Sequence, residues 1–259
     1  MDLFYWLSGG FSGALIGFSL ALIGGGGSIL AVPLMVYLVG VSQPHVAIGT
    51  SALAVAVNAA TGLVNHARKG NVVWKTGLLF AAAGVVGAFF GSTAGKAFDG
   101  QKLLFLFAIL MIVVGALMLR RKGDGGGSTG ELTRDNAPKV GATGLGAGLA
   151  SGFFGIGGGF LIVPGLIAST RMPMLNAVGT SLVGVTAFGL TTALNYAASG
   201  LVDWALAGLF VVGGLLGSLA GTRAAAHFSS KGQLTKIFSL IIFVVAAYML
   251  YRSGQEAFA

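Results

Sequence analysis

Two glycine-rich segments give this sequence its most suggestive chemistry. Residues 24–27 are four consecutive glycines followed by Ser28, and residues 155–159 carry four glycines around Ile156. Such runs interrupt a helix, because ordering glycine costs more backbone entropy than ordering any other residue. The helical piece that follows a break offers free backbone N–H groups and the positive end of its dipole, which can hold an anion. We therefore expect a cradle for a small anion, with these candidate residues: Gly25, Gly26, Gly27, Ser28, Gly157, Gly158 and Gly159.

A Gly-Thr-Ser triplet follows each break, at residues 49–51 and 179–181. Its hydroxyl groups can donate to an oxyanion, so we expect Thr50, Ser51, Thr180 and Ser181 to line the same site. Two plainer explanations remain open. Glycines let membrane helices pack closely, and helix hydroxyls often bond back to their own backbone.

Three asparagines lie within apolar stretches, where an unpaired amide is costly. Asn58, Asn65 and Asn195 are therefore expected to line a pathway or gate, together with His66 and Tyr196, which directly follow two of them. The alternatives are hydrogen bonds between helices for the amides and an interfacial position for the histidine.

Several chemistries are disfavoured. The chain has no cysteine, and its seven acidic residues all lie at termini, in loops or at segment edges. A buried-acid proton pump, a carboxylate cation site and an intramembrane hydrolase would each need such groups within a span. No GxxxxGK[ST] loop occurs. We expect no enzymatic activity, no cofactor and no metal.

The elements that must hold these residues are membrane helices. Of 259 residues, 55% are hydrophobic and 8% are charged, whereas a soluble domain carries roughly a quarter charged residues. That excludes a soluble enzyme, a nucleic-acid binder and a disordered chain. Uncharged stretches long enough for spans of about 20 residues predict an all-α polytopic membrane protein in a lipid bilayer.

The chain contains an internal duplication. Gly24-x-Gly26-Gly27-x-x-Leu30-x-Val32-Pro33 recurs as Gly155-x-Gly157-Gly158-x-x-Leu161-x-Val163-Pro164, 131 residues later, and Asn65 and Trp74 recur as Asn195 and Trp204, 130 residues later. The predicted organisation is a first membrane repeat over 1–120, a linker over 121–139 and a second repeat over 140–259.

The charges favour one threading of these repeats. If the broken stretches 3–42 and 140–170 were kinked spanning helices, Lys and Arg would divide nine to six across the membrane. If they are re-entrant hairpins, each unit crosses the membrane three times and the second unit is inverted relative to the first. Twelve basic residues then share one face and leave Lys96, Lys102 and Arg252 on the other. Because cytoplasmic loops are rich in Lys and Arg, we expect inverted repeats with a cytoplasmic linker and both termini outside. Such repeats with broken helices are typical of secondary transporters.

These motifs resemble the sulfite exporter TauE/SafE family. The resemblance rests on Gly24 to Leu34, on Ala47-Ile48-Gly49-Thr50-Ser51, on Asn65-His66-x-Arg68-x-Gly70-x-Val72-x-Trp74 and on the matching motifs of the second unit. It implies a permease of the bacterial inner membrane for small sulfur-containing anions such as sulfite or an organosulfonate. The second unit departs from the pattern at Tyr196, where the first has His66.

The expected function is thus an alternating-access exporter of a small sulfur anion held between two broken-helix N-termini. An anion channel, or a carrier of another anion such as a carboxylate, is the alternative. A coupling ion (H⁺ or Na⁺) and a homo-oligomer are both compatible with the sequence, whereas a nucleic-acid partner is not expected.

Overall fold

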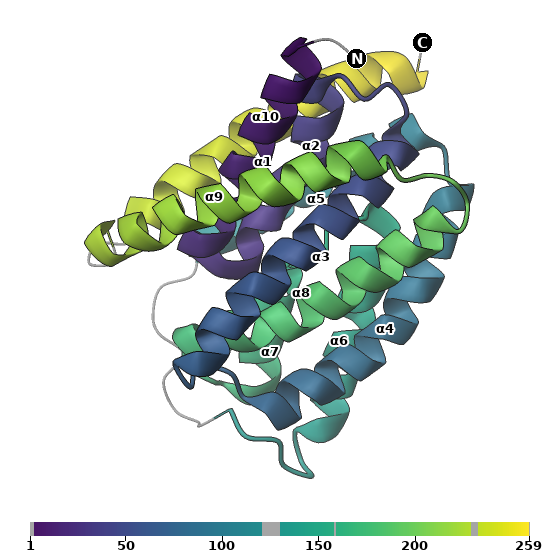
Figure 1. Cartoon of the computed structure of the whole chain (residues 1–259). Helices are drawn as coiled ribbons and strands as arrows, with labels where there is room; N and C mark the ends of the chain where they lie inside the picture. The colour runs from purple at the N-terminus through teal and green to yellow at the C-terminus, as the bar shows by residue number, and fades with distance from the viewer. Residues whose placement is uncertain (1–2, 121–129, 158, 229–232, 259) are drawn as a thin grey trace.

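The computed structural model describes residues 3–120, 130–157, 159–228 and 233–258, and in those residues all regular structure is helical (Figure 1). The longer helices are α1 (Leu3–Ile23), α3 (Pro44–Arg68), α4 (Trp74–Ala97), α5 (Gly100–Arg120), α6 (Ala137–Phe154), α7 (Gly159–Thr170), α8 (Met174–Ala197), α9 (Trp204–Phe228) and α10 (Gln233–Phe258). Four described helical stretches are long and apolar enough to cross a membrane: α3, α4, α8 and residues Trp204–Gly221 of α9.

The α-helix stops at both glycine-rich segments. After α1 the chain forms a 3₁₀ turn, η1 (Gly24–Leu30), a short α2 (Ala31–Pro33) and a π-helical turn, η2 (Leu34–Val39). This segment runs back along α1, because Gly27 packs on the backbone of Ser19 and Leu20, and Gly40 ends up beside Tyr5. After α6, Gly155 and Gly157 take positive φ angles of 69° and 63° and turn the chain into α7. Only glycine adopts such angles without strain.

Small residues hold the helices in close pairs. α1 packs on α9, and α4 packs on α6, through positions where a Cβ atom would collide with the backbone of the partner helix. These close approaches pair Gly13 with Phe210, Gly17 with Gly214, Gly144 with Phe80 and Gly148 with Gly84. Each contact of one helix pair thus has a counterpart, 130 or 131 residues away, in the other. The glycines at 84, 87, 91, 214, 217 and 221 therefore act as packing surfaces, as small residues do in membrane helices.

In two further pairs, each helix packs against the equivalent helix of the other half. α3 packs on α8 and α5 packs on α10. Along α3 and α8 the contacts run in opposite directions, since Gly62 meets Leu182 whereas Ala56 meets Gly189. The contacts between α1 and α9 instead advance together, from Gly13 with Phe210 to Gly17 with Gly214. α3 and α8 are therefore antiparallel, and α1 and α9 are parallel.

Large apolar side chains cover much of the outer surface. Leu7 of α1, Phe90 of α4, Leu194 of α8 and Leu216 of α9 are each more than 60% exposed. The interior is also apolar, with Phe80, Phe188 and Phe210 fully buried at its centre. Because a water-soluble fold buries such side chains, an apolar interior inside an apolar surface fits a protein surrounded by lipid.

Candidate functional site

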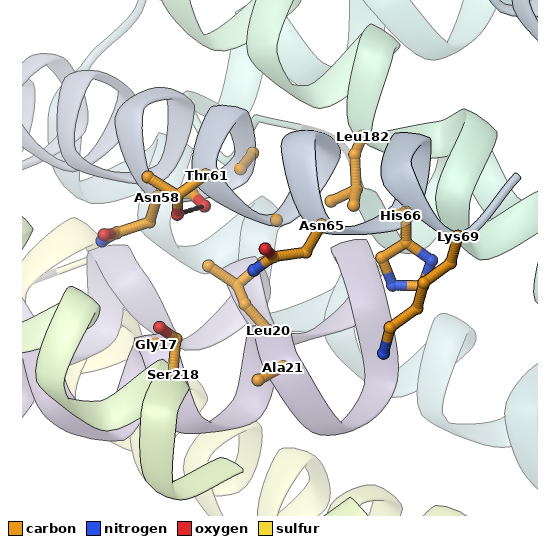
Figure 2. A pocket seen from close by; sticks show the side chains of 12 residues that line it. Gly17, Leu20, Ala21, Asn58, Thr61, Asn65, His66, Lys69, Leu182 and Ser218 are labelled. Carbon is orange, nitrogen blue, oxygen red and sulfur yellow. Dashed lines mark hydrogen bonds between the residues drawn. The ribbon is translucent and has the colours of Figure 1, made fainter. Parts of the chain in front are cut away.

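A cavity of about 80 Å³, lined by both polar and apolar residues, lies between α1, α3, α8 and α9 (Figure 2). A water molecule needs roughly 10–15 Å³ on this measure, so the cavity has room for about five waters or for one small oxyanion. Its lining is Gly17, Leu20, Ala21, Asn58, Ala59, Thr61, Gly62, Asn65, His66, Lys69, Leu182 and Ser218. We call it the α3 cavity, because α3 and its C-cap supply most of these residues.

The cavity follows α3 from its end to its middle. Asn65 and Lys69 are exposed at the end of the helix, whereas Asn58 is 93% buried. The eleven residue steps from Asn58 to Lys69 rise about 16 Å at 1.5 Å per residue, which is roughly half the hydrocarbon thickness of about 30 Å. The cavity therefore extends from the end of α3 to about the middle of that helix and ends at Asn58.

Asn58 closes the deep end of the cavity with an incompletely bonded amide. Its Oδ1 atom is buried without a hydrogen-bond partner, and its backbone oxygen accepts from Thr61 Oγ1 at 2.7 Å. Gly214 of α9 leaves the space that this amide occupies, since a Cβ atom there would collide with it. A buried amide that offers both a donor and an acceptor can bind a polar ligand that enters the cavity.

The mouth of the cavity is cationic. Lys69 lies there, and the lining contains no Asp or Glu among the residues that the structure describes. His66 Nδ1 lies 3.5 Å from Asn71 Nδ2, and Figure 2 shows Asn65, His66 and Lys69 together at this end. Three of the five predicted pathway residues, Asn58, Asn65 and His66, thus line one cavity, and the charge at its mouth favours an anion.

Asn195 lies at the opposite end of the molecule, where the two halves are fastened together. Lys96 Nζ of α4 donates to Asn195 Oδ1 at 2.8 Å, to Asn195 O at 2.9 Å and to Ser199 Oγ at 2.8 Å. Asn195 Nδ2 donates in turn to Ser92 Oγ at 2.6 Å and to Thr93 Oγ1 at 2.9 Å. These bonds join the ends of α4 and α8.

Tyr196 is fully buried next to this cluster. Its ring centroid lies 6.3 Å from that of His45 and 6.0 Å from Lys96 Nζ. Deeper in the second half, Phe188 stacks on Phe80 with their ring centroids 6.0 Å apart. Phe188 occupies the position that is equivalent to Asn58, so this half is sealed where the first is open.

The Gly-Thr-Ser triplets connect the two halves. Thr50 Oγ1 accepts from the backbone N–H of Asp203 at 2.9 Å, and Thr180 Oγ1 accepts from that of Val73, also at 2.9 Å. Gly49 and Gly179 lie against the carbonyl groups of Leu201 and Asn71. Each triplet therefore holds the loop that precedes a tryptophan-initiated helix of the other half. The sequence contains the motif twice, but nothing in it indicates that the partner lies in the other repeat.

The serines of these triplets bond within their own helices. Ser51 Oγ donates to Ile48 O at 3.0 Å, and Ser181 Oγ donates to Val178 O at 2.7 Å. All four triplet hydroxyls are buried, and none of them lines the α3 cavity.

The glycine breaks pack against protein atoms in this conformation. A Cβ atom on Gly157 would approach Val55 Cγ1 within 2.8 Å, and one on Gly27 would collide with the backbone of α1. Gly25 and Gly26 lie in η1, Ser28 and Gly159 are buried, and Gly158 lies outside the described residues. The α3 cavity therefore does not reach the predicted cradle.

Two lysines at these sites, Lys69 and Lys96, were not predicted from the sequence to be functional residues. The sequence indicates only a topological role for them, because basic residues near segment ends normally have that role. The spacing of Lys69 from Asn65 and His66 on one helix was the available signal. In the described parts of the chain, no three His, Asp or Glu side chains come close enough together to hold a metal ion.

Known proteins similar to this chain are membrane transporters by name. A probable membrane transporter protein of Xylella fastidiosa (strain 9a5c) is 53% identical over 250 residues, which cover 96% of each chain. The probable membrane transporter protein YdhB of Bacillus subtilis is 29% identical over 81% of this chain and 86% of its own length. No solved structure matches. The model of the family described as sulfite exporter TauE/SafE matches residues 10–249. The chain therefore belongs to the sulfite exporter TauE/SafE family of membrane transporters.

Proposed function

We propose that this protein is a secondary transporter that exports a small sulfur-containing anion, such as sulfite or an organosulfonate, by alternating access. The observation that carries the proposal is an asymmetry between equivalent regions of the two halves. The α3 cavity is open from Lys69 to Asn58, whereas the equivalent positions in the second half are closed by Phe188 and by the contacts of Lys96. A carrier must expose its site on one side at a time, and a channel must not be sealed in its conducting state.

The helix pairing supports an inverted repeat. Equivalent helices α3 and α8 are antiparallel, and the α1–α9 and α4–α6 contacts correspond to one another through the sequence offset. A two-fold axis in the plane of the membrane would produce both features. We therefore propose that each repeat is a hairpin (α1 with η1–η2, or α6 with α7) followed by three membrane helices.

The charges support an opening toward the cytoplasm. Arg68, Lys69 and Lys75 lie around the turn between α3 and α4, at the end where the α3 cavity opens. Lys96, Lys102 and Arg252 lie at the other end, where α4 stops, α5 begins and α10 finishes. Under the positive-inside rule the cavity faces the bacterial cytoplasm, which is the side from which an exporter takes its substrate.

The lining supports a small oxyanion as the substrate. Lys69 attracts a negative charge at the mouth, and the amide of Asn58 can donate to one oxygen at the deep end. Its carbonyl can also accept from an oxyanion that keeps one O–H group, as hydrogen sulfite does. We propose that the anion enters here and moves on to a backbone cradle at residues 25–28 and 157–159 when the helices rearrange.

Counterflow in proteoliposomes tests this function. The purified protein should accumulate labelled sulfite when the vesicles are preloaded with unlabelled sulfite. Vesicles preloaded with a carboxylate such as acetate serve as the comparison. Equal exchange of acetate would assign a different substrate, and voltage-driven flux without trans-stimulation would make the protein a channel.

A further inference from the structure

Three buried hydroxyl groups of the sealed half have no hydrogen-bond partner. They are Ser151 Oγ on α6 and Thr192 Oγ1 and Tyr196 OH on α8, and all three side chains are fully buried. A hydroxyl buried without a partner loses its bonds to water and gains nothing in return. The sealed conformation therefore carries a cost at these three places.

The repeat relates all three residues to the α3 cavity. Ser151 is equivalent to Leu20, Thr192 to Gly62 and Tyr196 to His66, by the offsets of 131 and 130. Each of those counterparts lines the α3 cavity. The unpartnered hydroxyls thus lie where the second half would have its own cavity if it were open.

One lysine accounts for much of the closure. Lys96 makes three hydrogen bonds to Asn195 and Ser199, which are equivalent to Asn65 and Lys69 of the open half. Asn65 is exposed in the open half. Lys96 itself has no basic counterpart, because the equivalent position is Ala226. The first repeat therefore supplies a lysine to both places: Lys69 at the end of α3 lies at the mouth of the α3 cavity, and Lys96 of α4 lies against Asn195 of the second repeat.

We propose that Ser151, Thr192, Asn195 and Tyr196 line a second, collapsed polar pathway for a small oxyanion, and that Lys96 is the latch that holds it shut. The inference rests on the proposed transport cycle. When the latch opens, the three hydroxyls gain water or anion oxygens as partners, and the released ammonium group of Lys96 lies at the new mouth. The exit pathway then has hydroxyl donors where the entry pathway has Leu20, Gly62 and His66.

Thiol labelling tests the latch, because the chain has no cysteine of its own. Thr192→Cys is the probe of the second pathway and Gly62→Cys is the matched probe of the α3 cavity, each treated with a membrane-impermeant methanethiosulfonate. With Lys96 intact we expect slow labelling at 192 and fast labelling at 62. Lys96→Met should raise the rate at 192 at least tenfold, from the Lys96 face only, and should lower the rate at 62. Lys96→Arg, which keeps the charge and the donors, should behave like the parent.

A second variant that breaks the Lys96 contacts, and a second cysteine probe of the second pathway, make the result independent of any one substitution. Asn195→Ala removes the acceptor of the latch and should act like Lys96→Met, and Ser151→Cys should respond like the probe at 192. Unchanged slow labelling at 192 and 151 in both release variants overturns the proposal, as does labelling of all probes from both faces. The assay needs no substrate. A protein that shows this labelling pattern but does not transport sulfite would therefore contradict the proposed substrate and still support the role of Lys96.

Discussion

At the scale of single residues, the amide of Asn58 is the group best placed to recognise a substrate. It is buried at the deep end of a cavity, it leaves an acceptor unbonded, and Gly214 provides the room that it needs. The equivalent residue of the second half is Phe188, which packs on Phe80 and offers no polar atom. The two equivalent positions therefore differ in polarity even though the helices are paired.

Replacing Asn58 by leucine should impair transport without unfolding the protein. A hydrogen bond to a charged ligand contributes about 1.5–3 kcal/mol, which corresponds to a roughly 10- to 150-fold rise in the half-saturating sulfite concentration. Sulfite counterflow measures this value, and size-exclusion chromatography in detergent verifies folding. Asn58→Ser, which keeps a donor and an acceptor, is the matched control and should lose less. If the Asn58→Leu variant has the same half-saturating sulfite concentration as the parent, Asn58 is not part of the binding site.

The glycines of the breaks are poor places for such a test. A Cβ atom on Gly27 would collide with the backbone of α1, and Gly157 combines a positive φ with a close approach to Val55. A substitution at either position changes the fold before it changes an anion site. Their packing role follows from these contacts, and their role as a cradle stays a prediction.

At the scale of elements, two threonines hold the halves together. Thr180 accepts the backbone N–H of Val73 just before α4 begins, and Thr50 accepts that of Asp203 just before α9 begins. Both helices begin with a tryptophan. Val73 gives α4 no side-chain cap, whereas Asp203 Oδ1 accepts from the backbone N–H of Leu206 in α9 at 2.9 Å. The threonine of the opposite half thus satisfies an N–H group at the start of a membrane helix, where no intrahelical partner exists.

Thr180→Val should destabilise the protein by about 1–3 kcal/mol, because it leaves the N–H of Val73 without an acceptor in a partly buried position. Thr180→Ser keeps the oxygen and should cost much less. Thermal unfolding in detergent compares the two variants, and Thr50→Val should show a similar loss because its contact is equivalent. If Thr180→Val and Thr180→Ser unfold at the same temperature as the parent, the hydrogen bond contributes no stability.

Much of this arrangement of elements could be predicted from the sequence. The glycine runs predicted the two helix breaks, because the effect of glycine on a helix acts over a few residues. The hydrogen-bond partners of Thr50 and Thr180 could not be predicted, since each lies more than 100 residues away in the other half. Asn65 and Asn195 are identical in type and position in their repeats, yet Asn65 is exposed, whereas Asn195 is hydrogen-bonded to Lys96, Ser92 and Thr93. That difference depends on which conformation the protein has adopted, and a repeated sequence motif does not specify the conformation.

At the scale of the whole molecule, the two halves share the same glycine packing contacts, but among the described residues the α3 cavity has no open counterpart at the equivalent positions of the second half. The α1–α9 and α4–α6 pairs keep the same glycine contacts, so an exchange of the open and closed halves need not break them. The contacts that differ are those of Lys96 and Asn195 at one end, that of Phe188 with Phe80 deeper in the molecule, and those around Lys69 at the other end. We expect a transport cycle in which these differing contacts exchange while the glycine-packed pairs move as rigid bodies, as in inverted-repeat transporters.

The proposed threading places the two ends of α5 on opposite sides of the membrane. Phe98, in the short loop before α5, is 39% exposed, and Asp135, just before α6, is exposed at the other end of the molecule. Single cysteines introduced as Phe98→Cys and Asp135→Cys should therefore react with an impermeant thiol reagent from opposite faces. In intact cells only the cysteine at 98 should be labelled, and in inverted vesicles only the one at 135. Labelling of both from one face would mean that α5 does not cross the membrane, and the positive-inside assignment of the Lys69 end would fall with it. Opposite labelling with the cysteine at 135 outside would reverse the orientation of the molecule in the membrane. The α3 cavity would then open outward, and the same geometry would describe uptake rather than export.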